Sequence, residues 1–176
     1  MFFRRKPPPD WDDSPSSDRV EDKDTKLPKL AAQPPAVFLL AMLGGAVIDA
    51  YAVPLSIGLG WAGGVLGVLI VATGIALTMM AMQAYRKAAS SPDPHHMPTA
   101  LVVTGPYART RNPLYLGTLM IMLGIGIGTN MPWFLIAAVP VMAIIHYGVV
   151  LREEAYLEDL FGERYRTYRA GVRRWV

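Results

Sequence analysis

Long apolar segments alternate with short turns and charged loops over most of this chain. Four such segments cover residues 36–59, 61–83, 114–129 and 132–150. A helix needs about 20 predominantly apolar residues to cross the hydrocarbon core of a bilayer, so the pattern predicts membrane-spanning helices. The third segment would form only about 24 Å of helix, which is short for a complete crossing. Within it, the run GIGIG (124–128) predicts close packing against another helix.

The connections between these segments predict two helical hairpins. Gly60 separates the first pair of segments, and Asn130 with Met131 separates the second pair. We therefore expect an all-α fold, an integral membrane bundle of four transmembrane helices in two tight hairpins with an amphipathic cytosolic C-terminal helix. The first hairpin would occupy residues 35–83, and residues 84–176 would hold a connecting loop, the second hairpin and the C-terminal helix.

The two ends of the chain are polar and differ in pattern. Residues 1–34 are rich in proline and charge and bury too little apolar surface to offset the entropy of ordering. We expect a disordered cytosolic tail there rather than a secretory signal. After Leu151, apolar and aromatic residues recur at steps of three and four, which predicts an amphipathic helix that Gly162 would interrupt. The shared face of this helix would carry Glu154, Leu157, Phe161, Tyr165 and Tyr168.

The composition and the placement of charge exclude an ordinary soluble domain. Apolar residues make up 52% of the 176 residues and charged residues 18%, against a usual charged share of about 25%. Only six of the charges lie between Leu30 and Leu151, so this region cannot present a water-exposed surface. The chain has no cysteine, which excludes disulfides and thiolate metal ligands.

Lysine and arginine are confined to three places, and this predicts the orientation in the membrane. All 17 fall in the N-terminal tail, the 84–113 loop or the region after Leu151, and neither hairpin tip carries one. The positive-inside rule then puts both termini and the central loop in the cytoplasm, and we expect a bacterial inner membrane. This distribution of basic residues favours contact with anionic lipid headgroups of the bilayer and does not suggest nucleic acid as a partner.

Two polar elements on the expected cytoplasmic side could carry chemistry. The loop before the third apolar segment reads TALVVTGPYARTRNPLYLG, and the helix after the fourth reads REEAYLEDLFGERYRTYR. Together they offer carboxylates, guanidiniums and tyrosines, a set that suits a cationic or polyhydroxylated ligand because aromatic faces attract cations. The alternative is an interfacial aromatic belt whose arginines contact lipid phosphate. The residues alone leave both interpretations open.

The same two strings resemble the isoprenylcysteine carboxyl methyltransferase superfamily, which includes the phospholipid methyltransferases. The family pattern runs roughly as L-V-x-x-G-P-Y, then R-[HN]-P-x-Y-x-G, a hydrophobic hairpin, and E-E-x-x-L-x-x-x-F-G-x-x-Y-x-x-Y. The resemblance covers about residues 84–172. The matching residues are Leu101, Val102, Gly105, Pro106, Tyr107, Arg111, Asn112, Pro113, Tyr115, Gly117, Glu153, Glu154, Leu157, Phe161, Gly162, Tyr165 and Tyr168.

The resemblance implies an integral membrane methyltransferase that uses S-adenosyl-L-methionine and methylates a lipid-like acceptor embedded in the bilayer. In the family the cofactor lies between the loop motif and the C-terminal helix, and the acceptor reaches it from the membrane. Carried over residue by residue, the cofactor-binding residues would be Thr99, Ala100, Leu101, Val102, Tyr107, Asn112, Pro113, Leu114, Tyr115, Glu153 and Glu154.

Departures from the family pattern leave the identity of the acceptor open. Asn112 and Thr99 stand where the eukaryotic carboxyl methyltransferases have histidine, and Val149 stands where those enzymes use an arginine toward the substrate carboxylate. The resemblance is strongest to carboxyl O-methylation of an isoprenoid-like acceptor, with N-methylation of a phospholipid amine as the alternative. A non-catalytic membrane carrier or assembly partner is the alternative from another class.

The sequence alone does not identify a catalytic group. The candidates are Asp49 inside the first span, His146 one turn before the end of the fourth, and Arg111 in the loop motif. An intramembrane carboxylate suggests a function, and a histidine near the reacting groups could act as a base. The alternative for each is a packed structural residue. His95 and His96 have no carboxylate cluster beside them, so no metal site is expected. The sequence does not indicate the oligomeric state.

Overall fold

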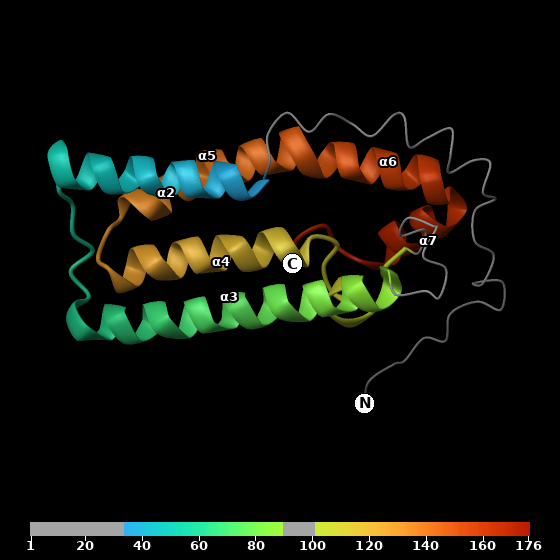
Figure 1. Cartoon of the computed structure of the whole chain (residues 1–176), viewed down its shortest axis with the longest axis horizontal. Helices are drawn as coiled ribbons and strands as arrows, with labels where there is room; N and C mark the ends of the chain where they lie inside the picture. The colour runs from blue at the N-terminus through green and yellow to red at the C-terminus, as the bar shows by residue number, and fades with distance from the viewer. Residues whose placement is uncertain (1–33, 90–100) are drawn as a thin grey trace.

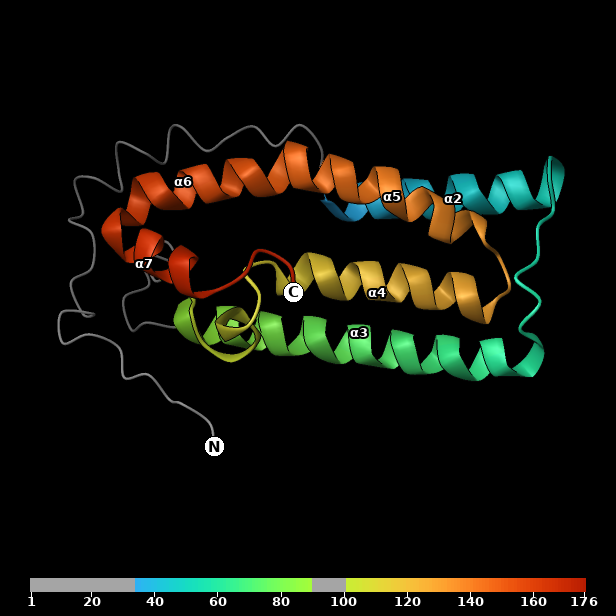
Figure 2. The ribbon, with the colours of Figure 1, turned by 180° about the vertical axis from the view of Figure 1, so that it is seen from behind.

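The computed structural model describes residues 34–89 and 101–176, so most of the expected N-terminal tail and part of the central loop lie outside the described residues. Every regular element in these two ranges is helical, which confirms the all-α prediction for them. Figure 1 and Figure 2 show the helices from opposite sides. In chain order they are α2 (Pro34–Tyr51), α3 (Gly60–Ala89), the 3-10 turn η1 (Gly105–Ala108), α4 (Pro113–Gly128), α5 (Trp133–Ile145), the π-helical turn η2 (His146–Val150), α6 (Leu151–Phe161) and α7 (Glu163–Gly171).

Within residues 34–89 and 101–176, three helices are long and apolar enough to cross a membrane. They are Pro34–Tyr51, Gly60–Ala88 and Trp133–Phe161. The third combines α5, η2 and α6, so the expected amphipathic helix continues the last apolar segment without a break. Helix α4 has only 16 residues, as the length of its apolar segment predicted. Large apolar side chains such as Leu40 and Val68 are each 68% exposed on the outer surface, which is the surface expected of a protein embedded in lipid.

The helices pair differently from the expected first hairpin. Helix α3 packs along α4, and α2 packs along α5, as both views show (Figure 1; Figure 2). The tight turn expected at Gly60 is instead the irregular segment 52–59. Helix α2 ends at Tyr51 because Pro54 has no N–H and disfavours helical backbone in the residue before it. The segment docks on the α4–α5 turn, where Oδ1 of Asn130 accepts hydrogen bonds from the backbone N–H groups of residues 57 and 58.

Glycines let the backbones of α3 and α4 approach closely. A Cβ added to Gly67 would lie 2.5 Å from the carbonyl oxygen of Gly124 and from the Cα of Gly128. No side chain fits at position 67, so the close packing predicted from the GIGIG run is confirmed. Because α3 and α4 are joined through the central loop, their contact brings the two ends of that loop together near α6 and α7 (Figure 1).

Candidate functional site

The polar elements gather at one end of the bundle. The C-terminal end of α3, the turn η1, the start of α4 and helices α6 and α7 all lie there, whereas segment 52–59 and the α4–α5 turn lie at the opposite end (Figure 1; Figure 2). Leu101 of the loop packs against a buried cluster of Phe161, Tyr165 and Tyr168. The part of the central loop from Leu101 onward is therefore folded onto the C-terminal helices.

The expected aromatic face of the C-terminal helix exists, but two helices build it. Gly162 has a φ of +55°, a left-handed conformation that glycine adopts without the strain of a side chain. It ends α6 and starts α7. Phe161 on α6 then packs with Tyr165 and Tyr168 on α7 in one cluster. The change of direction turns α7 back toward the loop, where the hydroxyl of Tyr168 donates a 2.7 Å hydrogen bond to the carbonyl oxygen of Tyr107.

Tyr107, Tyr115 and Glu153 form one cluster, which we call the Tyr–Glu cluster. The hydroxyl of Tyr115 near the start of α4 donates a 2.7 Å hydrogen bond to Oε1 of Glu153 near the start of α6. Burial, together with the neighbouring Tyr85 and Glu153, raises the pKa of Tyr107 to about 12. Tyr107 is therefore a neutral phenol at physiological pH, able to donate a hydrogen bond as well as to accept one.

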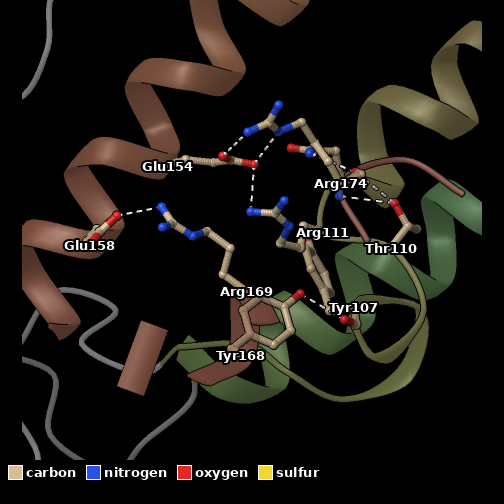
Figure 3. A network of polar contacts seen from close by, with 9 residues as sticks. Tyr107, Thr110, Arg111, Glu154, Glu158, Tyr168, Arg169 and Arg174 are labelled. Carbon is tan, nitrogen blue, oxygen red and sulfur yellow. Dashed lines mark hydrogen bonds and ion pairs between the residues drawn. The ribbon is translucent and has the colours of Figure 1, made fainter. Parts of the chain in front are cut away.

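Glu154 has different partners from its neighbour in the chain. Its two oxygens accept hydrogen bonds of 2.9 and 2.8 Å from Nε and Nη2 of Arg174, and Nη1 of Arg111 lies 2.9 Å from Oε1 (Figure 3). The side chains of Glu154 and Arg111 are only 9% and 10% exposed. A buried carboxylate is stable only when it is paired and hydrogen-bonded, and the two guanidiniums meet that requirement.

The backbone before α4 is bound to the C-terminal tail. Asn112 Nδ2 and Thr110 Oγ1 donate hydrogen bonds of 3.0 and 3.2 Å to the carbonyl oxygen of Arg174. The N–H of Arg111 donates a 3.0 Å bond to the carbonyl oxygen of Arg173, and an isolated parallel β-bridge pairs Thr110 with Arg173. Asn112 and Glu154, two of the residues that the family resemblance assigns to the cofactor, both bind Arg174.

The other expected cofactor residues belong to the start of α4 and to the loop before it. Pro113 is fully buried at the first helical position, where its missing N–H costs nothing. Leu114 beside it and Val102 in the loop are half-buried, while Leu101 packs on the aromatic cluster. Thr99 and Ala100 lie outside the described residues.

The three candidate catalytic residues lie in different surroundings. Asp49 belongs to the last turn of α2, at the end of the bundle opposite the Tyr–Glu cluster, and its Oδ1 accepts a hydrogen bond from the N–H of Leu55. Arg111 pairs with Glu154. His146 begins the π-helical turn, and within the described residues its Nδ1 is buried without a hydrogen-bond partner. The structure therefore does not bring these three residues together.

Sequence reasoning missed the C-terminal tail. Arg174 binds Glu154, and Trp175 packs against the main apolar core with its ring 6.1 Å from that of His146. The terminal run R-R-W carried a signal, because a tryptophan next to arginines just past an amphipathic helix can anchor a docked tail. No spacing in the sequence identified Glu154 as the partner of Arg174.

Comparisons with known proteins cover the same helices. A family model described as "Phospholipid methyltransferase" matches residues 63–164, which include α4, α5 and α6 with both members of the Tyr115–Glu153 pair. An uncharacterized protein of Haemophilus influenzae is 35% identical over 65 residues, which are 36% of this chain and the whole of that relative. No solved structure matches the chain.

Proposed function

This chain belongs to the phospholipid methyltransferase family, and we propose that it transfers a methyl group from S-adenosyl-L-methionine to a lipid-like acceptor in the membrane. The Tyr115–Glu153 hydrogen bond is the observation that carries the proposal. It joins the loop motif and the C-terminal motif of the family in one polar site. That site lies at the ends of apolar helices, so a water-soluble cofactor and a membrane-bound acceptor could both reach it.

The side chains of the Tyr–Glu cluster suit the polar groups of this cofactor. A carboxylate such as that of Glu153 can accept hydrogen bonds from ribose hydroxyls or from an ammonium group. The rings of Tyr107 and Tyr115 would tolerate the positive sulfonium, because aromatic faces attract cations. The first turn of α4, which begins at Pro113, offers backbone N–H groups and the positive end of the helix dipole to the cofactor's carboxylate.

The bound cofactor supplies an electrophilic methyl group, and the residues of this chain would orient the acceptor and exclude water from it. An amine acceptor is protonated at physiological pH and must lose a proton to accept the methyl group, and we assign this proton removal to His146, whose Nδ1 is buried without a partner among the described residues. A carboxylate acceptor carries no proton to remove. His146 precedes Glu153 by seven residues, roughly 10 Å along the helix toward the apolar segment. Arg111 cannot take this role because arginine stays protonated in proteins.

The acceptor would be either a carboxylate on an isoprenoid-like group or an amine on a lipid headgroup. Val149, at the position where the related carboxyl methyltransferases use an arginine toward the substrate, is buried in the apolar core with 1% exposure. Arg111 and Arg174 are both engaged by Glu154. A carboxylate acceptor would therefore find no guanidinium at the position where those enzymes provide one, and this observation favours the amine.

Titration calorimetry of the purified full-length protein with S-adenosylmethionine and S-adenosylhomocysteine tests the proposal. We expect saturable binding of both, and absence of binding by folded protein would favour the carrier. Mass spectrometry of lipid extracts from cells with and without the protein should then find a lipid heavier by one methylene. Mild alkali would remove the methyl group from an ester and leave it on an amine, so this treatment separates the two acceptors. The His146→Gln variant should bind the cofactor normally and lose the lipid product.

A further inference from the structure

We propose that residues 172–176 form a strap that positions the cofactor site, with Arg174 as the positioning residue. The strap lies beyond residues 63–164, which the family model matches. The inference rests on the proposed function, because the site that it positions is the one assigned to S-adenosylmethionine.

Arg174 connects α6 to the loop before α4 through its side chain and its backbone together. Its guanidinium donates two hydrogen bonds to Glu154 on α6, in the paired geometry in which the guanidinium matches a carboxylate. Its carbonyl oxygen accepts hydrogen bonds from Thr110 and Asn112 in the loop. Figure 3 shows this side chain between the two elements. A single residue thus binds the two segments that approach each other at the site.

These two segments also carry the Tyr–Glu cluster. Glu154 follows Glu153 on α6, and successive residues of a helix point about 100° apart, so one carboxylate faces the strap while the other faces Tyr115. Asn112 in turn comes just before α4, which carries Tyr115. The rotation of α6 relative to α4 is therefore set by two direct contacts, of Glu153 with Tyr115 and of Glu154 with Arg111, and by one contact through Arg174.

The strap itself is held on both sides of Arg174. Val172 packs on the aromatic cluster of α6 and α7, and Trp175 packs on the apolar core of the bundle. Between Val172 and Trp175, the carbonyl oxygen of Arg173 accepts a hydrogen bond from the N–H of Arg111. Arg174 is consequently fixed in register and does not move freely over Glu154. The ring of Trp175 also lies 6.1 Å from that of His146, so the strap extends from the cofactor site to the proposed proton acceptor.

A competing arrangement makes an opposite prediction. Arg174 is hydrogen-bonded to the side chains of Asn112 and Glu154, two of the residues that the family resemblance assigns to the cofactor. If the cofactor bound these two residues itself, the strap would have to leave, and removing Arg174 would increase affinity. If the strap positions the site, removing Arg174 decreases affinity.

The test measures binding of S-adenosylhomocysteine to full-length variants by calorimetry. We expect Arg174→Ala to lower the affinity at least tenfold, and Arg174→Lys to recover part of it because lysine keeps the charge and loses the paired geometry. Arg169→Ala is the matched control, since it removes a more exposed guanidinium that also binds a glutamate of α6, Glu158, but joins α6 to α7 and not to the loop before α4. This control should stay within twofold of the wild type.

A coupling measurement separates positioning from a general loss of stability. If Arg174 acts through Glu154, the double variant Arg174→Ala/Glu154→Gln should lose no more affinity than the stronger single variant. Additive losses, unchanged affinity in Arg174→Ala, or increased affinity would each overturn the inference. If Arg174→Ala does not fold, the affinity of Arg174→Lys is compared with that of the wild type in its place. If the wild type binds neither S-adenosylmethionine nor S-adenosylhomocysteine, the proposed function is wrong. If the wild type binds them and Arg174→Ala binds with the same affinity, only the role of the strap is wrong.

Discussion

The hydroxyl of Tyr115 donates a 2.7 Å hydrogen bond to Oε1 of Glu153, although 38 residues separate the two in sequence. Helix α5 and the π-helical turn lie between them in the chain, so the pair forms only when α4 packs beside α5 and the chain continues into α6. The packing of apolar helices therefore determines the geometry of a polar site at their ends.

Replacing Glu153 by Gln should weaken binding of S-adenosylhomocysteine roughly ten- to a hundredfold. Loss of a hydrogen bond to a charged group usually costs about 1.5–3 kcal/mol, which corresponds to that range of affinity. Glu163→Gln is the control, because its side chain is 80% exposed and lies on α7 away from the Tyr–Glu cluster. Calorimetric titration of the three proteins checks the prediction, and equal affinities for the wild type and Glu153→Gln would remove this glutamate from the site.

Tyr115→Phe should weaken the same binding by a smaller factor, about three- to tenfold. The ring stays in place while the carboxylate of Glu153 loses the donor that fixes its orientation, and a typical hydrogen bond contributes about 0.5–1.5 kcal/mol. Calorimetry on the single variants and on the Tyr115→Phe/Glu153→Gln double variant measures the coupling. Strictly additive effects would show that the two residues act independently.

Gly67→Ala should destabilise the bundle by about 1–3 kcal/mol, the usual cost of forcing extra atoms into a packed core. The new Cβ would lie 2.5 Å from backbone atoms of Gly124 and Gly128, which cannot move aside as a side chain can. Gly64→Ala is the matched control on the same helix, because its Cβ meets nothing within 4 Å. Thermal unfolding in detergent compares them, and equal midpoints would contradict the close contact of α3 and α4.

We propose that the end of the bundle with the Tyr–Glu cluster faces the cytoplasm of a bacterial cell. Single cysteines can test this, because the chain has none of its own. Leu55→Cys in segment 52–59 and Thr167→Cys on α7 both replace exposed residues at opposite ends of the bundle. An impermeant maleimide added to intact cells should label position 55 only. Labelling of position 167 alone would reverse the proposed orientation.

Stability should fall as the pH rises from 10 toward 12. Burial raises the pKa of Tyr107 from 10.0 to about 12 and also raises the pKa of Tyr168. In this range the unfolded chain has released protons that the folded chain retains, so the unfolded state binds fewer protons and the free energy of unfolding decreases with pH. Chemical denaturation at several pH values should show a shallower decrease for Tyr107→Phe. The same slope in both proteins would contradict a buried, protonated Tyr107.

The sequence by itself determined the helical class, the apolar segments and the two polar motifs. Apolar run length, the steps of three and four after Leu151, and the interruption at Gly162 are local properties, and local backbone preferences express them directly. The small residues of GIGIG likewise predicted a close helix contact, because glycine is the residue that lets backbones approach. The presence of the loop motif and the E-E pair indicated which segments would form a site.

Only the tertiary structure decided which partners these segments have. It paired α3 with α4 and α2 with α5 in place of the expected first hairpin, since buried contact between helices depends on which faces match and not on which helices are consecutive. It also gave adjacent Glu153 and Glu154 different roles, one toward Tyr115 and the other toward Arg174. The steps of three and four placed Glu154 on the buried face of the helix. The partners of the two glutamates are residues distant in sequence, however, and therefore have no signature in the sequence of the helix itself.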